Sequence, residues 1–158
     1  MNEFQIYPAG TANDLASVRE LFQEYADSLP VEVLPEDFQS ELQKFPQPYV
    51  LPEGLLLIAK RDEEIAGCIA LRKFSGKICE MKRLYVRQEF RGHSLGRRLA
   101  VAIIQQASEL GYSTMRLDTL PAMKAAIALY HSLGFIEIEP YFETKIQKTI
   151  FMGLDLKV

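Results

Sequence analysis

The sequence has few of the residues and patterns that several common functions require. Its two cysteines and two histidines are too scattered to offer a metal-ligand spacing. The formal net charge of −3 leaves no basic excess of the kind that nucleic-acid binding needs. The longest apolar run, residues 55–59, is far too short to span a bilayer, and the first residues do not resemble a signal peptide. We therefore expect no metal, no nucleic-acid or membrane partner, and a cytoplasmic location.

The composition is that of one globular domain. With 158 residues, of which 48% are hydrophobic and 25% charged, the chain can bury a substantial core. We place a single domain at residues 1–158. Cys68 and Cys79 both fall in strand-like stretches. Buried free thiols in a reducing compartment are the expected state, and a disulfide between adjacent strands is the alternative.

Hydrophobic periodicity and turn residues predict a strand, two helices, three strands, a helix, a strand, a helix and two strands. We expect Asn13 or Asp14 to cap the first helix, Pro30 to stop it, and Gly111 and Gly134 to end two later helices. The predicted strands cover residues 4–8, 55–60, 65–73, 80–86, 113–120, 135–138 and 149–156, and the predicted helices cover 14–29, 35–45, 95–110 and 122–133.

The connections between these strands predict how they pair. Short turns after the strands at 55–60 and 65–73 indicate hairpins, which are antiparallel. The strand–helix–strand unit from Glu80 to Leu120 predicts a parallel pair with a right-handed crossover. The expected fold is thus a mixed α/β fold, with one sheet and helices on both faces. The motifs Gly-x-x-x-x-Gly-Lys-Ser/Thr and Gly-x-Gly-x-x-Gly are absent, which argues against an ATP-binding P-loop and a Rossmann fold.

The stretch Arg91-Gly92-His93-Ser94-Leu95-Gly96 joins the strand at 80–86 to an amphipathic helix. The first amides of a helix lack intrahelical partners, and the helix dipole makes that end electropositive. Glycines allow close approach of a ligand, and Arg87, Arg91, Arg97 and Arg98 add positive charge nearby. These features suit a phosphate or pyrophosphate, although an ordinary turn with solvated arginines has the same pattern.

Two stretches together resemble the GCN5-related N-acetyltransferase (GNAT) family. RLYVRQEFRGHSLGRRLA, at 83–100, resembles motif A, whose acyl-CoA loop reads Arg/Gln-x-x-Gly-x-Gly/Ala. AIALYHSLGF, at 126–135, resembles a second signature, a helix ending in Leu-Tyr-x-x-x-Gly-Phe. The resemblance covers nearly the whole chain. It implies the acyl-CoA N-acyltransferase fold, with a central, mixed, mostly antiparallel twisted sheet whose two parallel strands splay apart to admit the pantetheine arm of acetyl-CoA.

The resemblance also implies which residues bind acetyl-CoA. The backbone of one strand segment is expected to pair with pantetheine, and loop amides are expected to bind the pyrophosphate. Ser94 departs from the family pattern, which often has glycine there, but serine can cap a helix and bond phosphate. The expected cofactor-binding residues are Leu84, Tyr85, Val86, Arg91, Gly92, His93, Ser94, Leu95, Gly96 and Arg97.

Two side chains are candidate catalytic groups by the same resemblance. Tyr130 matches the signature tyrosine, which acts in the family as a general acid toward the CoA sulfur; the alternative is a tyrosine that fills the core. Glu80 occupies a position where some members carry the base that deprotonates the amine through water. The alternative for Glu80 is a strand carboxylate that pairs with Lys82 or Arg83 or faces solvent. Met123 departs from a frequent asparagine and has packing as its simplest role.

The expected function is direct transfer of an acetyl group to a primary amine in a ternary complex. A catalytically weak CoA-binding sensor or scaffold of the same fold is the alternative, favoured by Ser94 and Met123. The sequence leaves the acceptor open among a small amine, an amino acid, a peptide N-terminus and a protein lysine, and homodimers are common among relatives. Strand charges that could face the acceptor are Arg72, Lys82, Arg83, Arg116 and Asp118, and Tyr141 and Phe142 either wall the acceptor site or pack under the last hairpin.

Overall fold

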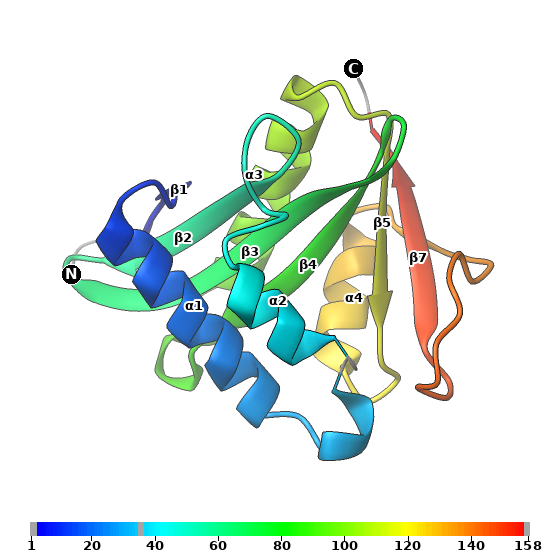
Figure 1. Cartoon of the computed structure of the whole chain (residues 1–158), viewed down its shortest axis with the longest axis horizontal. Coiled ribbons are helices and arrows are strands. Elements are labelled where there is room, and N and C mark those ends of the chain that lie inside the picture. Colours follow the sequence, from blue (N-terminus) through cyan, green and yellow to red (C-terminus); the bar gives the residue numbers. More distant parts are fainter. Residues whose placement is uncertain (1–2, 35–36, 157–158) are drawn as a thin grey trace.

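The computed structural model describes residues 3–34 and 37–156, and over these ranges the chain forms a seven-stranded sheet with four α-helices (Figure 1). The strands are β1 (Gln5–Pro8), β2 (Leu55–Arg61), β3 (Glu64–Ser75), β4 (Ile78–Val86), β5 (Thr114–Thr119), β6 (Ile136–Ile138) and β7 (Ile150–Asp155). The α-helices are α1 (Ala12–Asp27), α2 (Phe38–Lys44), α3 (Leu95–Glu109) and α4 (Lys124–Ser132), and two short 3-10 helices are η1 (Val31–Val33) and η2 (Gln88–Phe90).

The strands lie in the order β1-β2-β3-β4-β5-β7-β6. Every neighbouring pair is antiparallel except β4 and β5, which are parallel and joined through α3. A parallel pair needs such a long crossover, because a tight turn can only reverse the chain. The predicted mixed, mostly antiparallel sheet is confirmed, as is the parallel unit that contains the basic loop.

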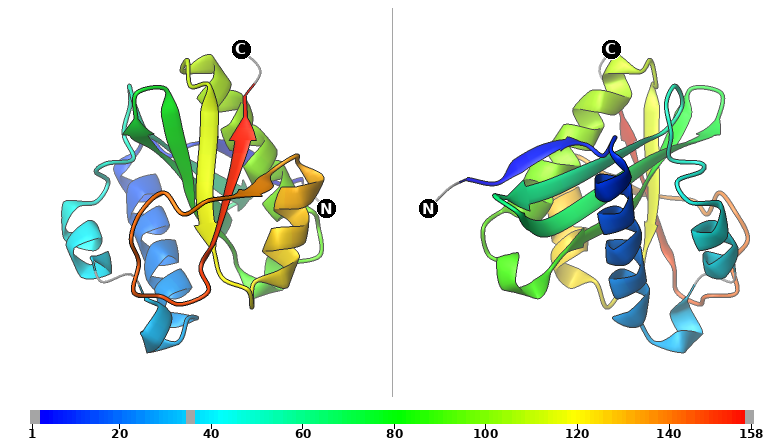
Figure 2. Two further views of the ribbon diagram at one scale, coloured as in Figure 1. Left: turned by 90° about the vertical axis from the view of Figure 1, so that its right-hand side faces the viewer. Right: turned by 60° about the vertical axis from the view of Figure 1, so that its left-hand side comes forward.

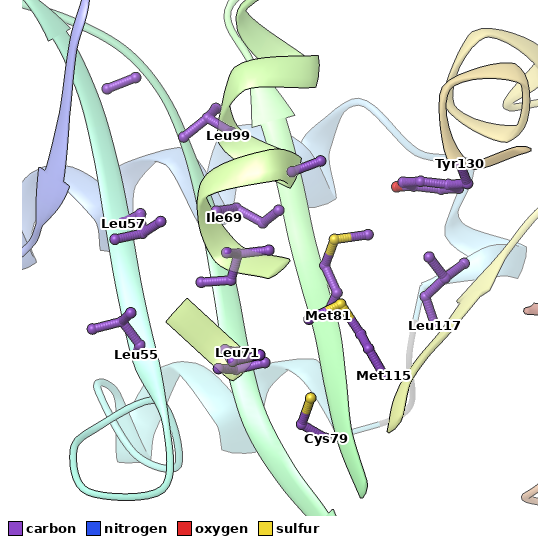
Figure 3. Close-up of a cluster of buried hydrophobic side chains, with 14 of the residues drawn as sticks. Leu55, Leu57, Ile69, Leu71, Cys79, Met81, Leu99, Met115, Leu117 and Tyr130 are labelled. Atoms are coloured by element: carbon purple, nitrogen blue, oxygen red, sulfur yellow. The ribbon is translucent and has the colours of Figure 1, made fainter. Parts of the chain in front are cut away.

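Helices cover both faces of the sheet: α1 and α2 lie on one side, and α3 and α4 lie on the other (Figure 2). The short apolar run in β2 follows from this arrangement. Leu55 and Leu57 belong to the core beneath α3, whereas Leu56 and Ile58 belong to the core beneath α1. Successive side chains of a strand point to opposite faces, so a strand covered on both faces is apolar throughout. Figure 3 shows the core on the α3 side.

Most helix ends match the sequence-based expectations, and the exceptions have a local cause. Gly111 and Gly134 take φ values of +97° and +102° after α3 and α4, as expected of glycines that end helices. The prediction of Asn13 or Asp14 as the first cap is wrong, because the Thr11 side chain accepts a hydrogen bond from the Asp14 amide at 3.0 Å. The predicted second helix begins at residues 35 and 36, outside the described residues, and α2 is observed from Phe38.

The parallel strands β4 and β5 pair over only part of their length. Their paired residues are Ile78 with Thr114, Cys79 with Met115, and Glu80 with Arg116. Beyond that point both strands continue without pairing, and they diverge toward the end where α4 begins (Figure 1). The parting leaves the backbone polar groups of two adjacent strands without the partners that a sheet would supply.

The opposite edge of β4 carries a β-bulge. Cys68 pairs with Tyr85 and Ala70 pairs with Lys82, so one intervening residue of β3 faces two residues of β4. Arg83 takes φ +58° there, and its carbonyl accepts a hydrogen bond from the Cys68 thiol at 3.5 Å. A bulge bends and twists its strand, which turns β4 away from β5.

Both cysteines are buried free thiols, as expected. Cys79 lies in the core beneath α3 and Cys68 in the core beneath α1, so the sheet separates them. Burial raises the pKa of both thiols above the ordinary range, to about 12 for Cys79, which makes them unreactive at neutral pH. No helix among the described residues is both long and apolar enough to cross a membrane.

We predict that Gly67→Ala will destabilise the protein by about 1–3 kcal/mol, the usual range for overpacking. A Cβ atom at residue 67 would lie 2.5 Å from the carbonyl oxygen of Tyr85, and a strand backbone cannot easily move away. Gly10→Ala is the matched control, because a Cβ atom there would meet nothing within 4 Å. Urea denaturation of both variants measures the difference, and an unchanged midpoint for Gly67→Ala would contradict the close approach of β3 and β4.

Candidate active site

A cavity of about 580 Å³ lies where β4 and β5 part. The end of α1, the segment before β7 and the loop between η2 and α3 complete its walls. Because β4 and β5 are adjacent strands that have separated, the cavity reaches elements on both faces of the sheet. Its lining includes Tyr25, Ser28, Leu29, Met81, Lys82, Arg83, Leu84, Tyr85, Val86, Arg91, Gly92, Ser94, Leu95, Gly96, Leu117, Asp118, Thr119, Met123, Tyr130, Ile146 and Thr149.

The structure brings most of the predicted site residues to this one cavity. The strand segment 84–86, most of the loop from Arg91 to Gly96, and Tyr130 all line it. Among the described residues, His93, Arg97 and Glu80 do not. The His93 ring lies 5.8 Å from the ring of Phe4, and Arg97 donates a hydrogen bond of 2.7 Å to the Ser132 hydroxyl.

The loop between η2 and α3 is held in an open conformation by two left-handed residues. Gly92 takes φ +87° and Ser94 takes φ +59°, directly before α3 begins at Leu95. The Ser94 side chain makes no capping hydrogen bond, so the expectation that its hydroxyl caps the helix is wrong. Its left-handed backbone is a conformation that glycine adopts without strain, which gives a physical reason for the family's frequent glycine. A Cβ atom at residue 92 would meet nothing within 4 Å.

The four arginines near this loop do not contribute equally to its charge. The Arg87 guanidinium pairs with Glu24 at 2.5 Å and with Glu20 at 3.6 Å, which neutralises it. Arg98 donates to the carbonyl of Phe4 at 3.1 Å. Arg91 lines the cavity, and its Nε donates to the Val86 carbonyl at 2.9 Å. Arg91 and the N-terminus of α3 are therefore the main positive features at this end of the cavity.

Tyr130 projects from α4 into the gap between the strands. Its side chain is 7% exposed and packs edge-to-face on Phe135 at 5.8 Å. In Figure 3 its hydroxyl points toward β4, and Leu117 of β5 lies on the same side of the gap as the Tyr130 ring. Burial raises the pKa of Tyr130 above that of an ordinary phenol, and the charge of Asp118 and a nearby Tyr25 raise it further. The hydroxyl thus stays protonated at neutral pH and can donate a proton.

The α1 side of the cavity carries two of the strand charges expected near the acceptor, Arg83 and Asp118, and also Tyr25, which the sequence did not single out. Tyr25 lines it from the end of α1, and burial raises the pKa of its phenol, while Arg83 lowers it and Asp118 raises it. Arg83 is only 8% exposed and pairs with Glu41 through bonds of 3.0 and 3.1 Å. Glu41 also accepts a hydrogen bond from Tyr49. The positive charge of Arg83 is thus balanced inside the protein. Asp118 is a cavity-lining carboxylate near Tyr25 and Tyr130.

Glu80 lies at the end of the paired part of β4, and its carboxylate has partners inside the protein. The Tyr141 hydroxyl donates to its Oε2 at 2.7 Å, and Arg72 pairs with its Oε1 at 3.5 Å. The alternative prediction, that Glu80 pairs with Lys82 or Arg83, is wrong: its ionic partner is Arg72, and Arg83 binds Glu41. Tyr141 and Phe142 pack edge-to-face against Phe151, which matches the packing alternative for these two rings.

Met123 precedes α4 and lines the cavity. Its sulfur lies 3.6 Å from the Thr119 hydroxyl, which donates a weak hydrogen bond to it. Helix α4 begins at Lys124, later than predicted. The residues before Met123 therefore belong to a turn that lines the cavity. The spacing of hydrophobic residues in the sequence could not have predicted this turn.

The family model described as the acetyltransferase (GNAT) family matches residues 17–135. The chain belongs to this family. An N-acetyltransferase of Schizosaccharomyces pombe is 40% identical over 90% of this chain and 89% of its own length. Among solved structures, a GNAT-family acetyltransferase of Staphylococcus aureus has a TM-score of 0.80 at 20% identity, covering 98% of this chain and 100% of that one. An acetyltransferase structure from Salmonella typhimurium with its cofactor acetyl-CoA has a TM-score of 0.75 at 24% identity and covers 99% and 95%. This GNAT protein is accordingly an acetyltransferase with a fold that its structural neighbours share.

We predict that Ser94→Gly will stabilise this GNAT protein by about 0.5–1 kcal/mol, because relief of the left-handed strain exceeds the entropy that glycine adds to the unfolded chain. No capping bond is lost, since the Ser94 side chain makes none. Ser94→Ala keeps the strain and serves as the control, with an expected change near zero. Urea denaturation distinguishes them, and a destabilised Ser94→Gly variant would show that the hydroxyl has a structural role.

Proposed function

We propose that this protein is an acetyl-CoA-dependent N-acetyltransferase that transfers the acetyl group directly to a primary amine bound in the same cavity. The observation that carries the proposal is the cavity itself: it joins an electropositive loop to a buried, protonated Tyr130 across the gap between β4 and β5. Membership of the GNAT family supports the same chemistry.

The residues present fit acetyl-CoA as the acetyl-donor substrate. The loop from Arg91 to Gly96 offers small residues, the amides that begin α3, and the Arg91 guanidinium, which suit the pyrophosphate. The backbone of Leu84, Tyr85 and Val86 lies along the unpaired edge of β4 and suits the amides of pantetheine, which can pair with it as a strand would. His93, just before α3, and Arg97, in its first turn, are also proposed to help bind the cofactor.

Tyr130 is proposed as the general acid. The amine nitrogen attacks the thioester carbonyl carbon, the carbon–sulfur bond breaks, and the phenol protonates the leaving sulfur. The proton that the new amide nitrogen then loses returns through water to the phenolate. Burial raises the pKa of Tyr130, and the same low-dielectric surroundings raise the pKa of the leaving thiol. Because both pKa values rise, burial does not prevent proton transfer from the phenol to the sulfur.

The amine must lose a proton before it attacks, because alkyl ammonium groups have pKa values of about 10. Asp118 lines the cavity close to Tyr25 and Tyr130, so it can hold an ammonium group and receive its proton through water. Glu80, which the sequence predicted as the base, stays a prediction, and its bonds to Tyr141 and Arg72 make it the weaker candidate.

A screen for thiol release tests the proposed function. The protein is incubated with acetyl-CoA and pooled small amines, amino acids or peptides, and free CoA thiol is measured. Release in one pool would establish transfer and identify the acceptor class. Binding of acetyl-CoA without release in any pool would favour the sensor alternative, which the Ser94 and Met123 departures support.

Tyr130→Phe should lower kcat by about one to three orders of magnitude, as loss of a general acid does, with little change in acetyl-CoA affinity. A raised pKa means that the phenol holds its proton throughout the neutral range and loses it only above its ordinary value, so wild-type kcat should not fall with loss of this proton below about pH 10. Steady-state kinetics across pH measure both effects. Tyr7→Phe, outside the cavity, is the control. Unchanged turnover in Tyr130→Phe would remove this residue from the mechanism.

Gly92→Glu should abolish acetyl-CoA binding, because it places a carboxylate and a strained left-handed side chain in the loop proposed to hold pyrophosphate. Gly10→Glu introduces the same charge where a Cβ atom meets nothing, so its affinity should match the wild type. Calorimetric titration with acetyl-CoA compares the two variants. Retained affinity in Gly92→Glu would overturn the assignment of the loop.

A further inference from the structure

Glu80 occupies a structurally defined place: it is the residue of the last β4–β5 pair before the strands part. Its side chain is 4% exposed. A carboxylate at such a depth is stable only when its oxygens have partners. Oε2 accepts the hydrogen bond from Tyr141 at 2.7 Å, and Oε1 faces Arg72 at 3.5 Å. Both oxygens therefore face residues that do not line the cavity.

Tyr141 belongs to the segment of residues 139–149, which connects β6 to β7 and which we call the β6–β7 segment. The segment lies on the same side of the sheet as α1 and α2 (Figure 2). Two of its residues, Ile146 and Thr149, line the cavity. Within the segment the Thr149 hydroxyl donates to the Ile146 carbonyl at 2.8 Å, so these two wall residues are held together.

Tyr141 attaches this segment to the sheet. Its ring packs edge-to-face on Phe74 at 5.0 Å and on Phe151 at 5.2 Å, and the Arg116 guanidinium lies 4.9 Å from its centre. Its hydroxyl reaches Glu80 beneath these contacts. Burial and the adjacent Glu80 carboxylate raise the pKa of Tyr141, so its hydroxyl stays protonated at neutral pH and can donate to Glu80.

We propose that Glu80 is a positioning residue: together with Arg72 it anchors Tyr141, and through Tyr141 it holds the β6–β7 segment as a wall of the cavity. The identification of this wall with the acceptor site rests on the proposed function. The anchoring itself does not. A base must reach the substrate or a water beside it, whereas Glu80 does not line the cavity and its oxygens face Tyr141 and Arg72.

Hydrogen–deuterium exchange tests the anchor without any substrate. In Tyr141→Phe, amides of residues 140–149 should exchange about tenfold faster than in the wild type, the change expected when one buried charge-assisted hydrogen bond is lost. Tyr112→Phe is the control, because its hydroxyl bonds the Glu53 carbonyl elsewhere, and it should leave this segment unchanged. Unchanged exchange in Tyr141→Phe would overturn the proposal.

Kinetics separate positioning from proton abstraction, using the pooled amine that releases most thiol. If Glu80 positions the wall, Glu80→Gln and Tyr141→Phe should both raise the KM of that amine several-fold, with kcat within about threefold and the same pH profile as the wild type. Their effects should be less than additive in the double variant, because both act through one bond. Acetyl-CoA affinity should not change.

A catalytic role for Glu80 as the base predicts different kinetics. If Glu80 were the base, Glu80→Gln would lower kcat by about a hundredfold or more and remove the acidic limb of the pH profile, while Tyr141→Phe would leave both nearly unchanged. That outcome would overturn the proposal.

Should no pooled amine release thiol, the proposed function fails, and the exchange experiment still decides the anchor. Should Glu80→Gln not fold, Tyr141→Phe carries both measurements.

Discussion

The parting of β4 from β5 is the constraint on which the rest of the structure depends. Up to Glu80 and Arg116 the two strands pair as ordinary parallel neighbours, and beyond them they do not. A sheet that opens in its middle leaves backbone donors and acceptors unpaired, which is costly unless a ligand or water pairs with them. The protein thereby exposes, at one place, an edge of β4 that a pantetheine-like chain can complete.

Two ionic clusters, built on the buried charges of Arg83 and Glu80, lie beside this opening. On one side Arg83, at the bulge of β4, binds Glu41 of α2, which also accepts from Tyr49. On the other side Glu80 binds Arg72 and Tyr141. Removing one partner from a buried pair is strongly destabilising, because the other charge is left uncompensated. The clusters therefore fix α2 and the β6–β7 segment to β4, and the segment lines the cavity through Ile146 and Thr149.

Sequence patterns predicted the parts of this arrangement that depend on local chemistry. Alternation and turns located the strands, Gly111 and Gly134 ended their helices, and the two family signatures located the loop and Tyr130. They failed where a residue's role depends on distant partners. The Ser94 hydroxyl was expected to cap a helix, but Ser94 takes a left-handed conformation before α3 and its side chain makes no capping bond.

The partners of buried charges could not be predicted from the sequence either. Glu80 was predicted as the base, with pairing to Lys82 or Arg83 or exposure to solvent as the alternative, yet its partners come from β3 and from the β6–β7 segment. Tyr25 carried no signal beyond its place on a helix face, because only the packing of α1 against the sheet brings it to Asp118. Strand order and the bulge in β4 decide these contacts, and neither leaves a local pattern.

The central claim is that the opening between β4 and β5, with the loop before α3, binds CoA. Titrating isotopically labelled protein with CoA and following amide chemical shifts tests it most directly. The account predicts saturable shifts concentrated at Leu84–Val86 and Arg91–Arg97, with no comparable change in β1 or β6. Absence of shifts at saturating CoA, or shifts centred on another face, would contradict it.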